Sequence, residues 1–90
     1  MKNIRLDSFM IPFKDLLPEQ EPSSIFLIVL YDKPRDFPGG FVGRLFVLNK
    51  PTAYIVIRET FEELLETIPG YMVRLDPEPL DDPNIKAIFV

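Results

Sequence analysis

The segment of residues 32–40 is the part of the chain whose residue types best suit ligand binding. It holds two pairs of opposite charges, one aromatic residue, two prolines and two glycines. Pro38 and Gly39 suit the centre of a type II turn, and Gly40 provides a second position for a positive φ. Exposed amides in such a turn can face an anion, and two arginine forks nearby would clamp a carboxylate or phosphate. The candidate binding residues are Arg35, Asp36, Phe37, Gly39, Gly40 and Arg44.

The same segment also has a purely structural interpretation. Proline and glycine shape the turn, and Phe37 covers the edge of the core. Arg35 pairs with Asp32 or Asp36 in water, where an ion pair contributes a fraction of a kcal/mol. The spacing is not that of a phosphate-binding loop, so the sequence favours this structural interpretation.

A second group of polar side chains consists of four carboxylates, at Asp76, Glu78, Asp81 and Asp82. Calcium takes oxygen ligands of this kind, but a helix-loop-helix calcium site needs a central glycine, and three prolines stiffen this segment instead. Nothing in the sequence places the adjacent Asp81 and Asp82 across one cleft as a catalytic acid and base. We expect a solvated turn without a bound metal.

A third group consists of four glutamates, at Glu59, Glu62, Glu63 and Glu66. At helical spacing they favour the dipole at a helix N-terminus, although Glu62 and Glu66 repel each other one turn apart. We expect a solvated helix face. The alternative functions are docking of a basic partner and imitation of the DNA backbone.

The chain has no Cys and no His among its 90 residues, and this excludes several chemistries. Disulfides, thiolate nucleophiles and serine–histidine or cysteine–histidine pairs cannot form, and the usual zinc sites lack their ligands. We therefore expect no enzymatic activity and no cofactor.

Charge and hydropathy limit the partners. The formal net charge of −4 at pH 7 disfavours direct binding to nucleic acid or to an anionic membrane. The longest apolar run, residues 25–31, is shorter than the ~20 residues of a membrane helix, and the N-terminus lacks the pattern of a secretory signal. We expect a soluble cytoplasmic protein, and a bacterial or phage open reading frame is consistent with the chain.

Hydrophobic patterning predicts several strands and one clear helix. An apolar run at 24–31 predicts a central strand buried on both faces, and residues 41–48 and 53–58 predict two more strands around a tight turn at 49–52. Residues 71–75 and 85–90 predict shorter strands. Thr60 opens a helix at 60–68 through a capping box with Glu63, and Pro69 and Gly70 stop it. The apolar stripe of this helix consists of Phe61, Leu64, Leu65 and Ile68.

This order of elements predicts a small α+β domain spanning residues 1–90. We expect a mainly antiparallel sheet of four to five strands with the helix on one face, in the order β-β-β-α-(β)-β. If the third and last strands are neighbours, they run parallel. Residues 1–23 form an irregular segment, in which 4–10 suits a short strand and 14–17 a turn of helix.

The strands carry apolar side chains on faces that one helix does not fully cover, Tyr54 with Val56 and Ile88 with Val90. Such a face is a site of association unless residues 1–17 fold over it. We therefore expect a non-catalytic protein-interaction module that binds a protein partner or a second copy. The alternatives are a binder of small anions through residues 32–44 and an acidic inhibitor that mimics DNA.

Overall fold

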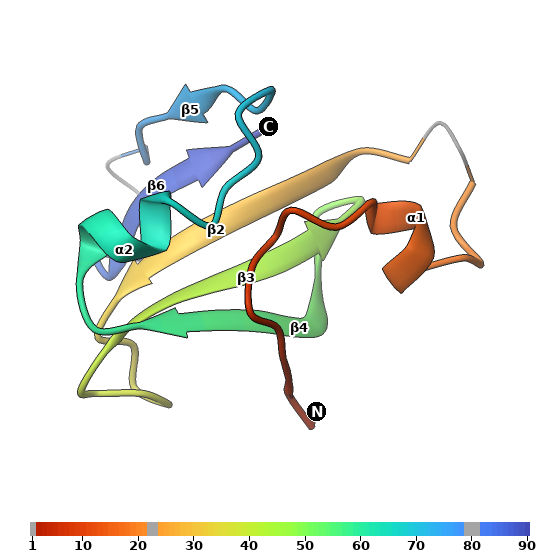
Figure 1. Ribbon diagram of the computed structural model, residues 1–90. Coiled ribbons are helices and arrows are strands. Elements are labelled where there is room, and N and C mark those ends of the chain that lie inside the picture. The colour runs from red at the N-terminus through yellow and green to blue at the C-terminus, as the bar shows by residue number, and fades with distance from the viewer. Residues whose placement is uncertain (1, 22–23, 79–81) are drawn as a thin grey trace.

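In the computed structural model, which describes residues 2–21, 24–78 and 82–90, these parts of the chain form a six-stranded sheet and two short helices. The order of strands across the sheet is β1-β4-β3-β2-β6-β5 (Figure 1). The elements are β1 (Ile4–Arg5), α1 (Phe13–Leu16), β2 (Phe26–Asp32), β3 (Phe41–Val47), β4 (Lys50–Arg58), α2 (Phe61–Leu65), β5 (Arg74–Leu75) and β6 (Ile85–Phe89).

The predicted α+β class is confirmed, but the sheet is larger than predicted and is mixed. The added strand is β1, which runs parallel to β4 with Ile4 opposite Tyr54 and Arg5 opposite Ile55. The strand expected at 4–10 ends at Arg5, and the turn of helix expected at 14–17 is present one residue earlier, as α1 at Phe13–Leu16. Six strands and two helices therefore replace the expected four to five strands and one helix.

The strand predicted at the centre of the sheet, β2, does lie there. It pairs antiparallel with β3 on one side and with β6 on the other. Its middle residues Ile28, Val29 and Leu30 are all buried. Because successive side chains of a strand point to opposite faces, the middle of β2 is buried on both faces, as predicted. The conditional expectation of a parallel pair between the third and last strands is not met, because β6 pairs with β2 rather than β4.

The turn between β3 and β4 differs from the predicted one at 49–52. Leu48 and Asn49 both have positive φ, at 51° and 65°, and Val47 lies opposite Lys50. This is the geometry of a two-residue type I′ hairpin turn, whose twist matches that of the strands. Lys50 and Pro51 therefore begin β4 instead of forming the turn.

The helix predicted at 60–68 starts where expected and ends early. The Glu63 amide donates to Oγ1 of Thr60 at 3.1 Å, as predicted, but the Glu63 carboxylate accepts from the Thr60 hydroxyl rather than from its amide. Regular α-helix ends at Leu65. Tighter turns follow, with the Thr67 amide bonded to Leu64 and the Ile68 amide to Leu65. Pro69 explains this ending, because a following proline disfavours helical backbone at the preceding residue.

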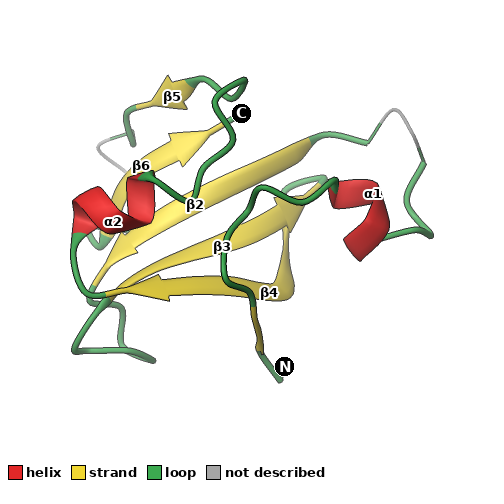
Figure 2. Cartoon of the chain, in the orientation of Figure 1, coloured by secondary structure: helices red, strands yellow, loops and turns green. Residues whose placement is uncertain are grey.

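The core lies between the sheet and a layer made of α2 and residues 6–17. Both helices and the segment leading to α1 lie on the same side of the sheet (Figure 2). Phe9 is fully buried at the centre of this layer, and the Tyr54 hydroxyl donates to the Leu16 carbonyl at 3.0 Å. The sequence did not show whether residues 1–17 cover the face that carries Tyr54 and Val56. In the structure, residues 6–17 and α2 together cover it.

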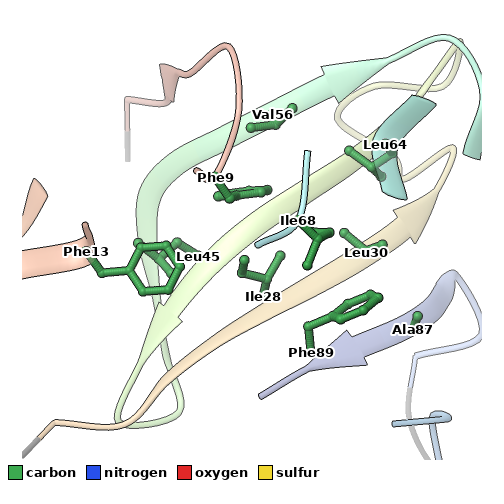
Figure 3. Packing of buried hydrophobic residues seen from close by; sticks show 10 residues of the cluster. All are labelled: Phe9, Phe13, Ile28, Leu30, Leu45, Val56, Leu64, Ile68, Ala87 and Phe89. Carbon is green, nitrogen blue, oxygen red and sulfur yellow. The ribbon is translucent and has the colours of Figure 1, made fainter. Parts of the chain in front are cut away.

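Ten buried side chains form the core cluster, and Figure 3 shows them meeting between the strands and the covering layer. The cluster consists of Phe9, Phe13, Ile28, Leu30, Leu45, Val56, Leu64, Ile68, Ala87 and Phe89. Of the predicted helical stripe, Leu64 and Ile68 belong to this cluster, while Phe61 and Leu65 pack against its border. In the described ranges no helix is long and apolar enough to cross a membrane.

Candidate functional site

Four of the six candidate binding residues line one cleft of about 500 Å³: Arg35, Asp36, Phe37 and Arg44. The loop after β2 forms one wall and residues 82–84 form another. Tyr31 and Val42 contribute from the neighbouring strands β2 and β3, where they lie opposite each other. The hairpin of β2 and β3 thus brings Arg44 back to the loop that precedes it in the chain.

The two glycines do not form the predicted anion cradle. They line a separate cleft of about 660 Å³, and no described glycine has a positive φ, so the type II turn at Pro38 and Gly39 is wrong. The Gly40 amide already donates to the Phe37 carbonyl at 3.3 Å. A Cβ at Gly40 would lie 3.3 Å from the Arg58 carbonyl oxygen. Close approach of backbone therefore explains Gly40.

Arg44 has a structural role that its sequence position did not reveal. Its Nη1 donates to the Thr52 carbonyl at 2.7 Å and to Oδ1 of Asn3 at 3.0 Å. The register of β3 and β4 shifts between Arg44 and Phe46, and the Thr52 hydroxyl donates to the Leu45 carbonyl at 2.7 Å. Arg44 therefore satisfies a carbonyl beside this irregularity and ties the N-terminal segment to the sheet.

The charges around the first cleft balance one another. Arg35 and Arg44 line it together with Asp36 and Asp82. Burial raises the pKa of the Tyr31 hydroxyl above its ordinary value of 10.0, the positive charge of Arg44 opposes this change, and Asp82 adds to it. A cleft with equal numbers of opposite charges has little preference for anions. The anion clamp between the two arginines stays a prediction.

The acidic segment after β5 does not gather its carboxylates in the described part of the chain. Asp76, Glu78 and Asp82 are exposed, and Asp81 lies outside the described residues. Oδ1 of Asp82 accepts from the Asn84 amide at 2.9 Å, which is a local turn. Among the described residues no group of three or more potential metal ligands comes together.

A different feature, the sheet face opposite the core, stands out in the structure. Directly paired residues on neighbouring strands point to the same side of a sheet, so the register identifies this face. One row of it crosses all six strands: Leu75, Ile88, Val29, Arg44, Ile55 and Arg5. A second row consists of Tyr31, Val42 and Ile57, and Leu27 pairs with Phe46 beside them. We call this side the open face.

The open face is largely apolar and neither helix covers it, although Val29, Val42 and Ile55 at its centre are only 6%, 2% and 1% exposed. Both helices and residues 6–12 lie on the other side of the sheet (Figure 2). Leu75 is 46% exposed, and Val73, two residues before it, is 60% exposed. Val73 exchanges both backbone hydrogen bonds with Val90, which extends the pairing of β5 and β6 and adds two valines to this edge. The first cleft lies at the far end of the same face.

Comparisons of the chain with family models, with curated proteins and with solved structures each found no match.

The sequence contained part of the signal for the open face. The apolar alternation of Ile88 and Val90 pointed to an uncovered face, but Val73 and Leu75 were not recognised as belonging to it. Their alternation with Arg74 is the available signal, because Arg74 lies on the opposite side, with its guanidinium carbon 5.6 Å from the centre of the Phe61 ring. The pairing of β5 with β6 that joins these residues to Ile88 is not a local property of the sequence.

Proposed function

We propose that this protein is a non-catalytic interaction module whose open face binds a second copy of the same chain. The observation that carries the proposal is the exposed apolar edge of the open face at Val73, Leu75 and Val90, with no helix packed on this side of the sheet. A sheet normally buries its apolar face against another layer, and sheet-on-sheet packing is a common solution. A second copy supplies such a layer by two-fold symmetry, with the same surface used by both chains.

The accessible surface area supports a missing partner. The chain exposes 6022 Å². Scaling from monomeric proteins gives roughly 5,400 Å² for a chain of 10.4 kDa, so the excess is about a tenth of the total. A standard interface covers about 800 Å² on each partner, which is of similar size to this excess. A dimer through the open face would bury an area of this size.

The distribution of charge keeps the acidic residues of α2 away from the open face, whereas Asp76 directly follows Leu75 at its β5 edge. The chain carries a net charge of −4, so two copies repel each other unless their acidic regions stay apart. Glu62, Glu63 and Glu66 lie on or next to α2, which packs on the side of the sheet opposite the open face. Two open faces can therefore meet while both α2 helices point away from the interface.

The test is sedimentation equilibrium of the wild-type chain and of a double variant, Val73→Lys with Leu75→Lys. We expect the wild type to sediment at twice 10.4 kDa. We expect the double variant to raise the dissociation constant by at least about tenfold, because each lysine would be buried twice in a symmetric interface.

Met10→Lys is the matched control, because Met10 and Val73 are each 60% exposed and lie on opposite sides of the sheet. This control makes the same kind of charge change and should leave the dissociation constant unaltered. A wild-type chain that stays monomeric at millimolar concentration would contradict the proposal, as would equal weakening by Met10→Lys.

A further inference from the structure

The first cleft combines charged side chains of both signs with apolar side chains. The loop of residues 33–40 extends past the ends of β2 and β3 and forms one of its walls (Figure 1). Arg35 and Asp36 are exposed on this loop, while Arg44 and Asp82 bring one more charge of each sign from other parts of the chain. The volume of about 500 Å³ is within the usual range for small-molecule sites. The cleft is therefore large enough for a small molecule that itself carries both charges.

The two charged side chains of the loop do not pair with each other. Within the described ranges, no hydrogen bond or ion pair engages the Arg35 guanidinium or the Asp36 carboxylate. The ion pair of Arg35 with Asp32 or Asp36 that we expected from the sequence is therefore not formed between these residues. Both side chains are available to a ligand that carries an anionic and a cationic group.

Tyr31 adds a hydroxyl group to the cleft. The side chain is half-buried on β2, and no hydrogen bond to its hydroxyl is formed by any described residue. Burial raises the pKa of this hydroxyl above its ordinary value of 10.0, which keeps it protonated at neutral pH. Arg44 lowers the same pKa and Asp82 raises it, so a charge of each sign lies near the hydroxyl. Tyr31 can therefore donate a hydrogen bond to the carboxylate of a ligand.

Apolar side chains complete the cleft. Phe37 is half-buried in the loop wall, and Val42 lies opposite Tyr31 on β3. Pro34 and Pro83 restrict the backbone of two walls, so little entropy is lost when a ligand orders them. These residues favour a ligand that has an apolar part beside its charged groups.

We propose that the first cleft binds a small zwitterion, a molecule with one ammonium group, one carboxylate and an apolar side chain. The carboxylate accepts from Arg35 and Tyr31, and the ammonium group faces Asp36. The apolar side chain packs against Phe37. A ligand with a single charge would meet a like charge in the same cleft, whereas a zwitterion is complementary to both signs. This site goes beyond the proposed function, which requires no ligand.

The experiment uses three forms of one amino acid that differ mainly in charge. L-phenylalanine is the zwitterion, N-acetylphenylalanine carries only the carboxylate, and phenylalanine amide carries only the ammonium group. Binding to the full chain is followed by amide chemical shifts at neutral pH and low ionic strength. We expect phenylalanine to bind at least about fivefold more tightly than either singly charged form, with shifts at Phe37, Arg44 and Asn84. Phenylalanylglycine, whose charges are farther apart, distinguishes a free amino acid from a short peptide as the source of the zwitterion.

Three variants assign the groups that hold the ligand. Arg35→Gln should weaken binding of phenylalanine and of N-acetylphenylalanine about fivefold without weakening the amide. Asp36→Asn should weaken phenylalanine and the amide by a similar factor without weakening N-acetylphenylalanine. Tyr31→Phe should weaken both carboxylate ligands about threefold and leave the unfolding temperature unchanged, because its hydroxyl has no described partner in the fold.

Lys14→Gln and Asp15→Asn are the matched controls. They make the same changes of charge at exposed positions of α1, which lies on the other side of the sheet (Figure 2). Both should leave the binding of all three ligands unchanged.

Equal affinity of the zwitterion and its singly charged forms, no binding of either zwitterion at millimolar concentration, or shifts confined to residues outside 31–44 and 82–85 would overturn the inference. The dimer-breaking variant Val73→Lys with Leu75→Lys separates this result from the proposed function, since neither residue lines the cleft. This variant should bind phenylalanine at least as tightly as the wild type does. A monomeric wild-type chain that binds phenylalanine would contradict only the proposed function, and a dimer that binds no zwitterion would contradict only this inference.

Discussion

Replacing Phe9 with alanine is expected to lower the free energy of unfolding by about 3–5 kcal/mol, the cost of removing a fully buried aromatic ring from a packed core. Phe9 is the only described aromatic residue with no exposed surface, and it comes from the irregular N-terminal segment rather than from a strand or helix. Its loss would detach residues 6–12 from the sheet and leave a cavity beside Leu30. Urea unfolding followed by circular dichroism measures the effect.

The stability of a small domain is itself limited, so Phe9→Ala is paired with the milder Phe9→Leu. We expect this second variant to fold and to lose roughly 1–2 kcal/mol. Met10→Ala is the control, because the neighbouring side chain is exposed and should cost less than about 0.5 kcal/mol. If Phe9→Leu and Met10→Ala have equal effects, the N-terminal segment does not contribute to the core as described.

Gly43→Ala is expected to lower the free energy of unfolding by about 1–3 kcal/mol through overpacking. A Cβ at this position would lie 2.8 Å from Cε2 of Phe9 and 3.0 Å from Cδ2 of Leu30. Gly43 does not have a positive φ, so the effect comes from space and not from backbone strain. Gly39→Ala is the matched control, because nothing lies within 4 Å of its added Cβ. It should be neutral or slightly stabilising.

The two substitutions should be coupled. In the Phe9→Leu background the ring atoms that meet the new Cβ are gone, so Gly43→Ala should cost less than in the wild type. A double-mutant cycle measures this difference, for which contacting residues typically give about 0.5–3 kcal/mol. Strict additivity would mean that Phe9 does not pack against Gly43.

Local patterns in the sequence predicted most of the elements and few of their pairings. Alternation and apolar runs located β2, β3 and β6 within one to two residues, and Thr60 marked the start of α2. The order of the strands in the sheet was harder to predict, because β6 pairs with β2, which lies more than fifty residues before it in the chain. The Leu48–Asn49 turn was missed because leucine rarely adopts a positive φ, while Pro51 gave a stronger but misleading turn signal.

The candidate site was likewise predicted in its local features and missed in its tertiary contacts. Residues 34–37 of the loop and Arg44 do line one cleft, as expected from a hairpin connection, while Gly39 and Gly40 line another. The role of Arg44 was not predictable, since it depends on a register shift in β4 that leaves the Thr52 carbonyl to be satisfied. Likewise, Gly40 was interpreted as a flexible turn residue, whereas it permits close approach to the Arg58 backbone. Tertiary contacts determine the roles of both Arg44 and Gly40.

The open face also separates this chain from a typical two-layer α+β domain. Its core is complete on the side of Phe9 and α2, and the other side of the same strands carries Val29, Ile55 and Ile88 with no helix over them. Val29 and Ile55 are nevertheless buried, at 6% and 1% exposed, and exposure is concentrated at the β5 edge. Under the proposed function, association through this face would complete a sandwich of two sheets.

The most direct measurement is an isotope-filtered NMR experiment on a mixture of labelled and unlabelled chains, which detects contacts between copies only. If the open face binds a second copy, we expect intermolecular cross-peaks that join the methyl groups of Leu27, Leu75 and Ile88 in one copy to the open face of the other, including the Phe46 ring. Cross-peaks confined to α2 or to residues 9–12, or none at millimolar concentration, would contradict it.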